Sequence, residues 1–138
     1  MDSNVFISFV REEIDSSFNL RGVDSESFFT FCSKNKVKLI LSGLFFEEVE
    51  RVVFLTVKDV LEAFERHDIV VEVFSDKPSK ELVSRIVREN KIHFEDAVHT
   101  AVSIESKSEA VITWNKKDFL KVSKLINIYS PSEILANL

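Results

Sequence analysis

Short apolar runs alternate along this chain with longer segments of helical periodicity, and no other feature of the sequence constrains the fold as strongly. Four runs have the length and composition of buried strands, at residues 37–41, 69–74, 110–113 and 126–129. Parallel strands in one sheet need long crossover connections, and the helical segments between the runs supply them. We therefore expect an α/β fold with a mostly parallel central sheet.

The same periodicity predicts where the helices begin and end. They are expected at residues 4–13, 25–34, 43–67, 78–90 and 94–107, with a short helix after Asn115 and a closing helix from Pro131. Residues 43–67 are expected to form two helices that meet near Thr56, and Pro78 to lie in the first turn of its helix. A polar connection through Asn19, Gly22 and Asp24 is expected before residue 25, and residues 69–74 are either a short strand or an extended linker.

Composition limits the number of domains and the chemistry of the chain. With 138 residues and no repeat or low-complexity tract, residues 1–138 are expected to form one domain. Cys32 is the one cysteine, which excludes an internal disulfide or a zinc site of several thiolates, and it is expected in the core. No apolar stretch has the length of a membrane span and no signal-like leader opens the chain, so we expect a cytoplasmic protein.

Asp2 and Glu48 are the first candidate site residues. Asp2 precedes the apolar start of a helix, which is typical of an N-cap. Glu48 follows the run at 37–41 and, at 100° per residue, falls inside the apolar arc of its helix between Leu55 and Val52. A carboxylate directed into an apolar arc is costly unless a cation or hydrogen-bond donors meet it. The helix geometry therefore favours a functional role for Glu48.

Asp96 is the third candidate. It lies in the first turn of the helix expected at 94–107, opposite the apolar side to which Phe94 is assigned. Its neighbours on the opposite side are polar: His99, Thr100 and Ser103. Taken alone, Asp96 is best explained as an exposed acid that the helix dipole favours.

Asn115 and Asp118 follow the run at 110–113 and are typical of a helix cap. In open parallel sheets, however, ligands bind beyond the carboxyl ends of the strands, and all these candidates are expected at one edge of the sheet. Carboxylates that converge without a basic partner are ordinarily bridged by Mg²⁺ or Mn²⁺. Such sites hydrolyse phosphate esters.

Four segments, in this order, resemble the motifs of the PIN-domain ribonucleases, a family that includes the toxin nucleases of many toxin-antitoxin pairs. They are DSNVFIS at 2–8, LSGLFFEEV at 41–49, EDAVHTAVSIESKSEAVITWNKKDF at 95–119 and INIYSPSEIL at 126–135. The resemblance covers nearly the whole chain and implies a three-layer α/β/α fold. In the family the first strand ends at the opening Asp, whereas here Met1 alone precedes Asp2. Either the native start lies upstream, or the sheet is one strand short and Asp2 lies near a mobile terminus.

Carried over by position, the resemblance implies that Asp2, Glu48 and Asp96 are the acidic metal ligands. The fourth acid of the family falls on Asn115, which carries no charge, and Asp118 is the alternative catalytic acid at that place. Ser3, Asn4 and Thr113 match polar positions that support the acids or the metal-bound water, a role that Asn115 is also able to fill. Lysines after the site are candidates to hold RNA phosphates or are simply solvated: Lys116, Lys117, Lys121 and Lys124.

The function implied is that of a Mg²⁺- or Mn²⁺-dependent endoribonuclease acting on single-stranded RNA, as a homodimer, with an antitoxin protein as the partner if the chain is a toxin. The alternative is a PIN-like module that binds RNA or a protein without cutting, which Asn115 favours. A receiver-type phosphate-binding domain is a third interpretation, but it would need a Lys after the last strand. No ligand role is assigned to His67, His93 or His99, whose spacing is not that of a zinc site. Trp114 either stacks on a base or, as its size favours, packs in the core.

Overall fold

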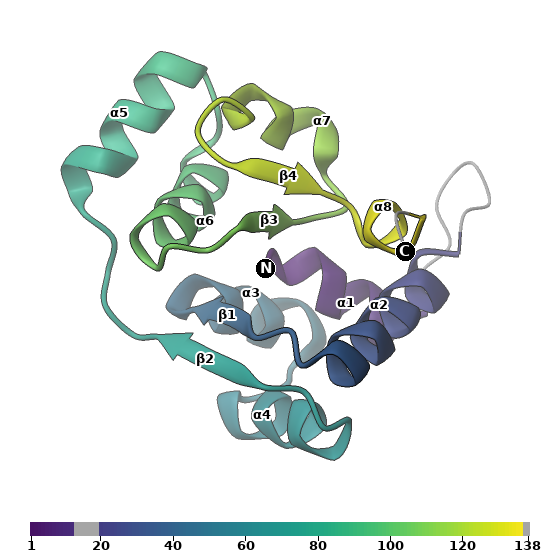
Figure 1. The fold of residues 1–138 in the computed structure, drawn as a ribbon. Helices are drawn as coiled ribbons and strands as arrows, with labels where there is room; N and C mark the ends of the chain where they lie inside the picture. The colour runs from purple at the N-terminus through teal and green to yellow at the C-terminus, as the bar shows by residue number, and fades with distance from the viewer. Residues whose placement is uncertain (13–19, 137–138) are drawn as a thin grey trace.

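The computed structural model, which describes residues 1–12 and 20–136, has a mixed α/β fold with short parallel strands (Figure 1). In chain order its elements are α1 (Ser3–Arg11), α2 (Arg21–Asn35), β1 (Leu39–Ser42), α3 (Gly43–Val53), α4 (Val57–Arg66), β2 (Val71–Phe74), α5 (Lys80–Asn90), α6 (Phe94–Glu105), β3 (Ala110–Ile112), α7 (Lys116–Phe119), the 3₁₀ helix η1 (Leu120–Val122), β4 (Asn127–Tyr129) and α8 (Pro131–Ala136). Each of the four apolar runs forms a strand, as the periodicity predicts.

The helix boundaries agree with the sequence in most places. Thr56 caps α4 through a reciprocal pair of hydrogen bonds with Asp59, so two helices do meet there. Two boundaries were wrong. The second helix begins at Arg21, which makes Gly22 and Asp24 helical, and Pro78 precedes the Ser79 cap of α5 instead of lying in its first turn. The predicted helix end at residue 13 and the loop residue Asn19 lie outside the described residues.

The strands do not form one continuous sheet. β1 pairs with β2 and β3 pairs with β4, both in parallel, as two separate two-stranded sheets among the described residues. The N-terminus lies between them (Figure 1). There the Met1 amino group donates to the carbonyl of Ile40 at 3.0 Å, and the Asp2 N–H donates to the carbonyl of Ile112 at 2.9 Å. The first two residues therefore join the two sheets, and Asp2, only 7% exposed, is held in place instead of lying on a mobile end.

The core falls into two clusters that match the two sheets. The first, around β1 and α1–α4, is rich in aromatic rings, with Phe6 in contact with four other phenylalanines. Cys32 is fully buried in it, and burial raises the pKa of its thiol to about 12, so it is an unreactive core residue as expected. The second cluster lies among α5, α6, β3 and β4. No helix in the described part of the chain is long and apolar enough to cross a membrane.

Candidate metal centre

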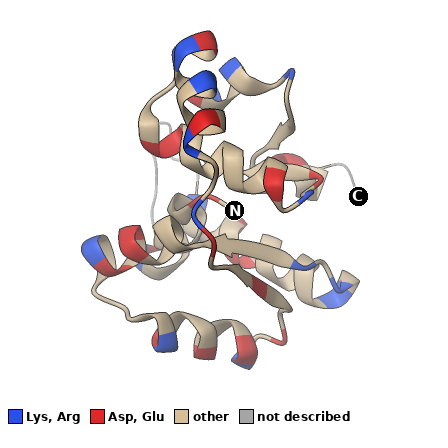
Figure 2. Ribbon diagram, turned by 90° about the vertical axis from the view of Figure 1, so that its left-hand side faces the viewer, with Lys and Arg blue, Asp and Glu red and all other residues tan. Residues whose placement is uncertain are grey.

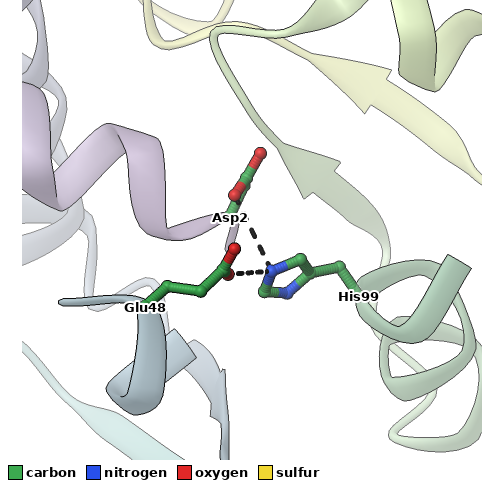
Figure 3. A group of neighbouring side chains, drawn as sticks. All are labelled: Asp2, Glu48 and His99. Carbon is green, nitrogen blue, oxygen red and sulfur yellow. Dashed lines mark hydrogen bonds and ion pairs between the residues drawn. The ribbon is translucent and has the colours of Figure 1, made fainter. Parts of the chain in front are cut away.

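Asp2, Glu48 and His99 come from three distant parts of the chain and point toward one another (Figure 3). Glu48 Oε1 lies 2.6 Å from His99 Nε2, and His99 Nε2 lies 3.8 Å from Asp2 Oδ1. One ligand atom from each residue lies within 4.8 Å of the other two, and the three side chains are largely buried. Two carboxylates and one imidazole therefore lie close enough together to bind one metal ion.

Glu48 is brought to this point by the packing of α3. Ser42 caps the helix by accepting from the N–H of Phe45, and the Phe45 and Val49 side chains are fully buried beneath it. Glu48 lies on the edge of this buried face, whereas its neighbour Glu47 is exposed. The inward direction that the helix geometry predicts for Glu48 is confirmed.

Asp2 caps α1 and also belongs to the cluster, so its two interpretations are compatible. Its Oδ2 accepts a hydrogen bond of 2.8 Å from Thr113 Oγ1. The contacts of Oδ1 are longer, 3.5 Å from both Ser3 Oγ and the N–H of Asn4. Oδ1 is therefore the Asp2 atom that faces His99 and remains available to a cation.

The polar residues expected to support the acids do contact them. Ser3 Oγ donates to Glu48 Oε1 at 3.1 Å, and Asn4 Nδ2 donates to Thr113 Oγ1 at 3.3 Å. Asn4 Oδ1 also accepts from the N–H of Trp114 at 3.1 Å. These bonds tie the start of α1 to α3 and to the end of β3. The indole of Trp114 donates to Ser25 and packs on the first core cluster, which is the core role predicted for it.

Asp96 lies beside this group but is not one of its three residues. It is half-buried, and burial together with the charges of Asp2 and Asp118 raises its pKa to about 6. The sequence-based prediction of an exposed acid was wrong. The expected sides of α6 were also wrong, because His99, Thr100 and Ser103 are buried and Phe94 is 65% exposed. The helix packs against α5 and toward β1 and α3, so its polar side is covered too.

His99 is the site residue that the sequence analysis missed. It was judged by the spacing of the histidines alone, which carries no metal signature. A different signal was present in the sequence, because His99 follows Asp96 by three residues and the two therefore share one side of α6. The other two histidines are not among the three clustered residues: His67 packs edge-on against Phe9, and His93 is the N-cap residue of α6, where its charge acts on Asp96.

Asn115 and Asp118 form a pair near Asp96, since Asn115 Nδ2 donates to Asp118 Oδ2 at 3.0 Å. Lys116 is paired with Glu133 at 2.6 Å. Lys117, Lys121 and Lys124 are exposed.

The electrostatics of the cluster suit a divalent cation. Burial pushes the pKa of Glu48 upward, but the hydrogen bond and charge of His99 and the bond from Ser3 outweigh it, so the net shift is downward. Arg51 approaches Glu48 Oε2 only at 3.9 Å. Within the described residues, the positive groups near the three carboxylates of Asp2, Glu48 and Asp96 are His99, the more distant Arg51, the Met1 amino group beside Asp2 and His93 beside Asp96. A cation bound by Asp2 Oδ1, Glu48 and His99 Nε2 would balance the charge of the carboxylates.

No family model, no curated protein and no solved structure matches this chain. The case for the site therefore rests on its geometry and on the chemistry of its donor atoms.

Proposed function

We propose that this protein is a metal-dependent endoribonuclease with a PIN-like three-layer fold that hydrolyses phosphodiester bonds of single-stranded RNA. The observation that carries the proposal is the convergence of Asp2, Glu48 and His99 from α1, α3 and α6, next to Asp96. Two of the three are acids that the motif resemblance picks out, and Glu48 is also selected by helix geometry. The position of Asp96 at the edge of the group supports the proposal further.

The donor set supports Mn²⁺ more strongly than Mg²⁺ as the bound ion. Carboxylate oxygens suit both ions, but an imidazole nitrogen raises the affinity for a transition metal. When bound, the cation would polarise the phosphodiester and acidify a water molecule for attack. Ser3 and Thr113 would keep the carboxylates of Glu48 and Asp2 oriented through the bonds they already make.

Asp96 is suited to accept the proton of the attacking water. In the metal-free protein, burial and the charges of Asp2 and Asp118 raise its pKa to about 6, which makes it a stronger base than an ordinary aspartate, and a bound cation would lower that pKa. Asp118, bound to Asn115, is placed to tune Asp96 through its charge. We include in the proposal a cytoplasmic homodimer that acts as the toxin of a toxin-antitoxin pair, with an antitoxin protein as partner.

A PIN-like module that binds RNA or a protein without cutting is the second candidate. The observation that favours it is Asn115, an uncharged residue where the resembled family has its fourth acid, whose amide is engaged with Asp118. Metal-dependent turnover separates the two candidates.

The test is cleavage of a mixed-sequence single-stranded RNA with Mn²⁺, Mg²⁺ or EDTA. We expect cutting with Mn²⁺, weaker cutting with Mg²⁺ and none with EDTA. Glu48→Gln should lower the rate by on the order of 100-fold, because it removes a charged donor, while Glu47→Gln, one residue away and exposed, should leave it unchanged. RNA that stays intact with both metals but still binds would replace the nuclease with the binding module.

Metal binding can be measured without turnover. Titration of Mn²⁺ into His99→Ala by calorimetry should give an affinity at least about tenfold below that of the unmodified protein, because one of three donors is lost. His67→Ala, which removes an imidazole away from the cluster, is the control and should bind Mn²⁺ normally. Equal Mn²⁺ affinity in His99→Ala would exclude His99 as a ligand.

A further inference from the structure

We infer that Phe94, together with Lys91 and Lys121, forms a subsite that stacks an unpaired base and binds the adjoining phosphates of a single-stranded polynucleotide. The inference deepens the proposed function and rests on it for the direction in which the strand would run toward the acids. It also stands on observations of its own, which are the exposure of one aromatic ring and the position of two cations.

Phe94 is an exposed ring at the N-terminal end of α6. It is the first residue of α6 and is 65% exposed, although most phenylalanines of this chain lie in the aromatic core. Two residues further on, Asp96 reaches the acidic group, and the intervening Glu95 is paired with Arg51 of α3 at 4.0 Å. The ring is therefore exposed on a helix end, two residues before Asp96, where it can stack on an unpaired base.

Two cations lie at the segment just before Phe94, because Lys91 belongs to that segment and Lys121 is hydrogen-bonded to it. Lys121 Nζ donates to the carbonyl of Lys91 at 3.4 Å, which places the Lys121 ammonium at the connection between α5 and α6. Both lysine side chains are exposed, and η1, which carries Lys121, packs on α5. Figure 2, viewed from the side of α5, shows Lys and Arg segments on α5 and on the chain after α7 at the same end of the molecule.

The combination of ring and cations fits a single strand. A ring can stack only on a base that is not paired, and each phosphate next to that base needs a cation. A duplex would hide its bases and needs a broad basic face, which a net charge of −5 does not provide. One exposed ring flanked by charged residues is also too small an apolar surface for a stable protein interface.

The experiment measures binding of a fluorescein-labelled single-stranded oligoribonucleotide by anisotropy in EDTA, so that neither metal nor cleavage enters. Phe94→Leu keeps an apolar side chain but loses the aromatic face and should weaken binding about tenfold, whereas Phe94→Trp should retain it. Lys121→Gln and Lys91→Gln should each weaken binding and lower its salt dependence by about one phosphate contact. Matched controls on α2, Val23→Ala and Lys34→Gln, change exposed residues of another face and should bind normally.

Further arms define the ligand. A strand of abasic sugar-phosphate and a fully paired duplex should show no dependence on Phe94, because neither offers a free base. Single-stranded RNA and single-stranded DNA of the same sequence are compared to find which of the two nucleic acids the subsite binds. Dependence on Phe94 in either of them supports the subsite, and Phe94→Leu that binds both within twofold of the unmodified protein overturns it.

The two proposals fail in different ways. Binding that depends on Phe94 without cleavage under any metal would leave the subsite standing and remove the nuclease. Metal-dependent cleavage with unchanged KM in Phe94→Leu, together with unchanged binding, would keep the nuclease and remove the subsite.

Discussion

Glu48 and Asp96 carry the same functional group at similar depth, yet their pKa values move in opposite directions. Burial raises both, but Glu48 accepts hydrogen bonds from His99 and Ser3, which favour its charged form. Asp96 faces the negative charges of Asp2 and Asp118, which disfavour ionisation. Because burial acts in the same direction on both carboxyls, the opposite directions of their pKa shifts come from the neighbours of each one.

Asp96→Asn should stabilise the metal-free protein at neutral pH. In the folded protein the pKa of Asp96 is about 6, above its ordinary value of 3.8. The contribution of protonated Asp96 to the stability of the folded protein is therefore complete below pH 3.8 and is lost as the pH rises through 6. The side chain is only half-buried, so we expect a gain of about 1 kcal/mol at pH 7.5 and none at pH 4. Urea denaturation of both proteins in EDTA at the two pH values measures this gain in unfolding free energy.

Glu89→Gln, an exposed acid of α5, is the control for that experiment and should change stability at neither pH. An equal gain for Asp96→Asn at pH 4 and pH 7.5 would show that the carboxyl is not held in the folded protein with a raised pKa.

At the scale of the element, α3 and α6 show where periodicity is a sufficient guide. α3 has one buried side, so the angle of Glu48 within the apolar arc was enough to place it near the interior. α6 is covered on more than one side, and its buried residues include Ala97 and Ala101 as well as His99 and Thr100. A pattern that assumes one buried face therefore misplaces the polar side of α6.

The crossing of α1 and α2 gives a test at this scale, because the two glycines of the chain meet different surroundings. A Cβ on Gly22 would lie 2.6 Å from the backbone of Glu12, whereas one on Gly43 would meet nothing within 4 Å. Gly22→Ala should lower the free energy of unfolding by about 1–3 kcal/mol through overpacking. Gly43→Ala, at the first residue of α3, should raise it by about 0.5 kcal/mol.

Chemical denaturation of both glycine variants provides the measurement. If Gly22→Ala were as stable as the unmodified protein, α1 and α2 would not approach as closely in solution as they do in the structure.

At the scale of the whole molecule, the two sheets depend on the first two residues for their connection. The Met1 amino group lies beside β1 and the Asp2 N–H beside β3, so the chain start fills the space between strands that do not pair with each other. The same residue, Asp2, then enters the candidate metal centre. The join between the sheets and the site are therefore formed by one segment.

This arrangement makes stability depend on pH between 6 and 8. Burial lowers the pKa of the Met1 amino group from 8.0 to about 6, so in this window the unfolded chain binds a proton that the folded chain does not. The unfolding free energy should therefore rise by about 2 kcal/mol from pH 6 to pH 8. It is measured by urea denaturation of protein whose first residue is Met1.

A protein with one Gly added before Met1 is the control. Its Met1 nitrogen is an amide that still has an N–H for the Ile40 carbonyl but cannot take a proton, and the histidines are unchanged. The unfolding free energy should rise more steeply with pH between 6 and 8 in the protein that begins at Met1 than in this control. Identical slopes would exclude a buried amino group.

The amino-acid sequence by itself determined the order of helices and strands, their parallel direction and the inward direction of Glu48. These properties follow from periodicity within segments of about ten residues, where each side chain is compared with its close neighbours. The division into two sheets, the place of His99 and the raised pKa of Asp96 were decided by the tertiary structure alone. They depend on contacts such as that of Glu48 with His99, 51 residues apart, and that of Thr113 with Asp2, 111 residues apart. Periodicity carries no record of such pairs, because a polar residue facing a distant carboxylate leaves the same local pattern as one facing water.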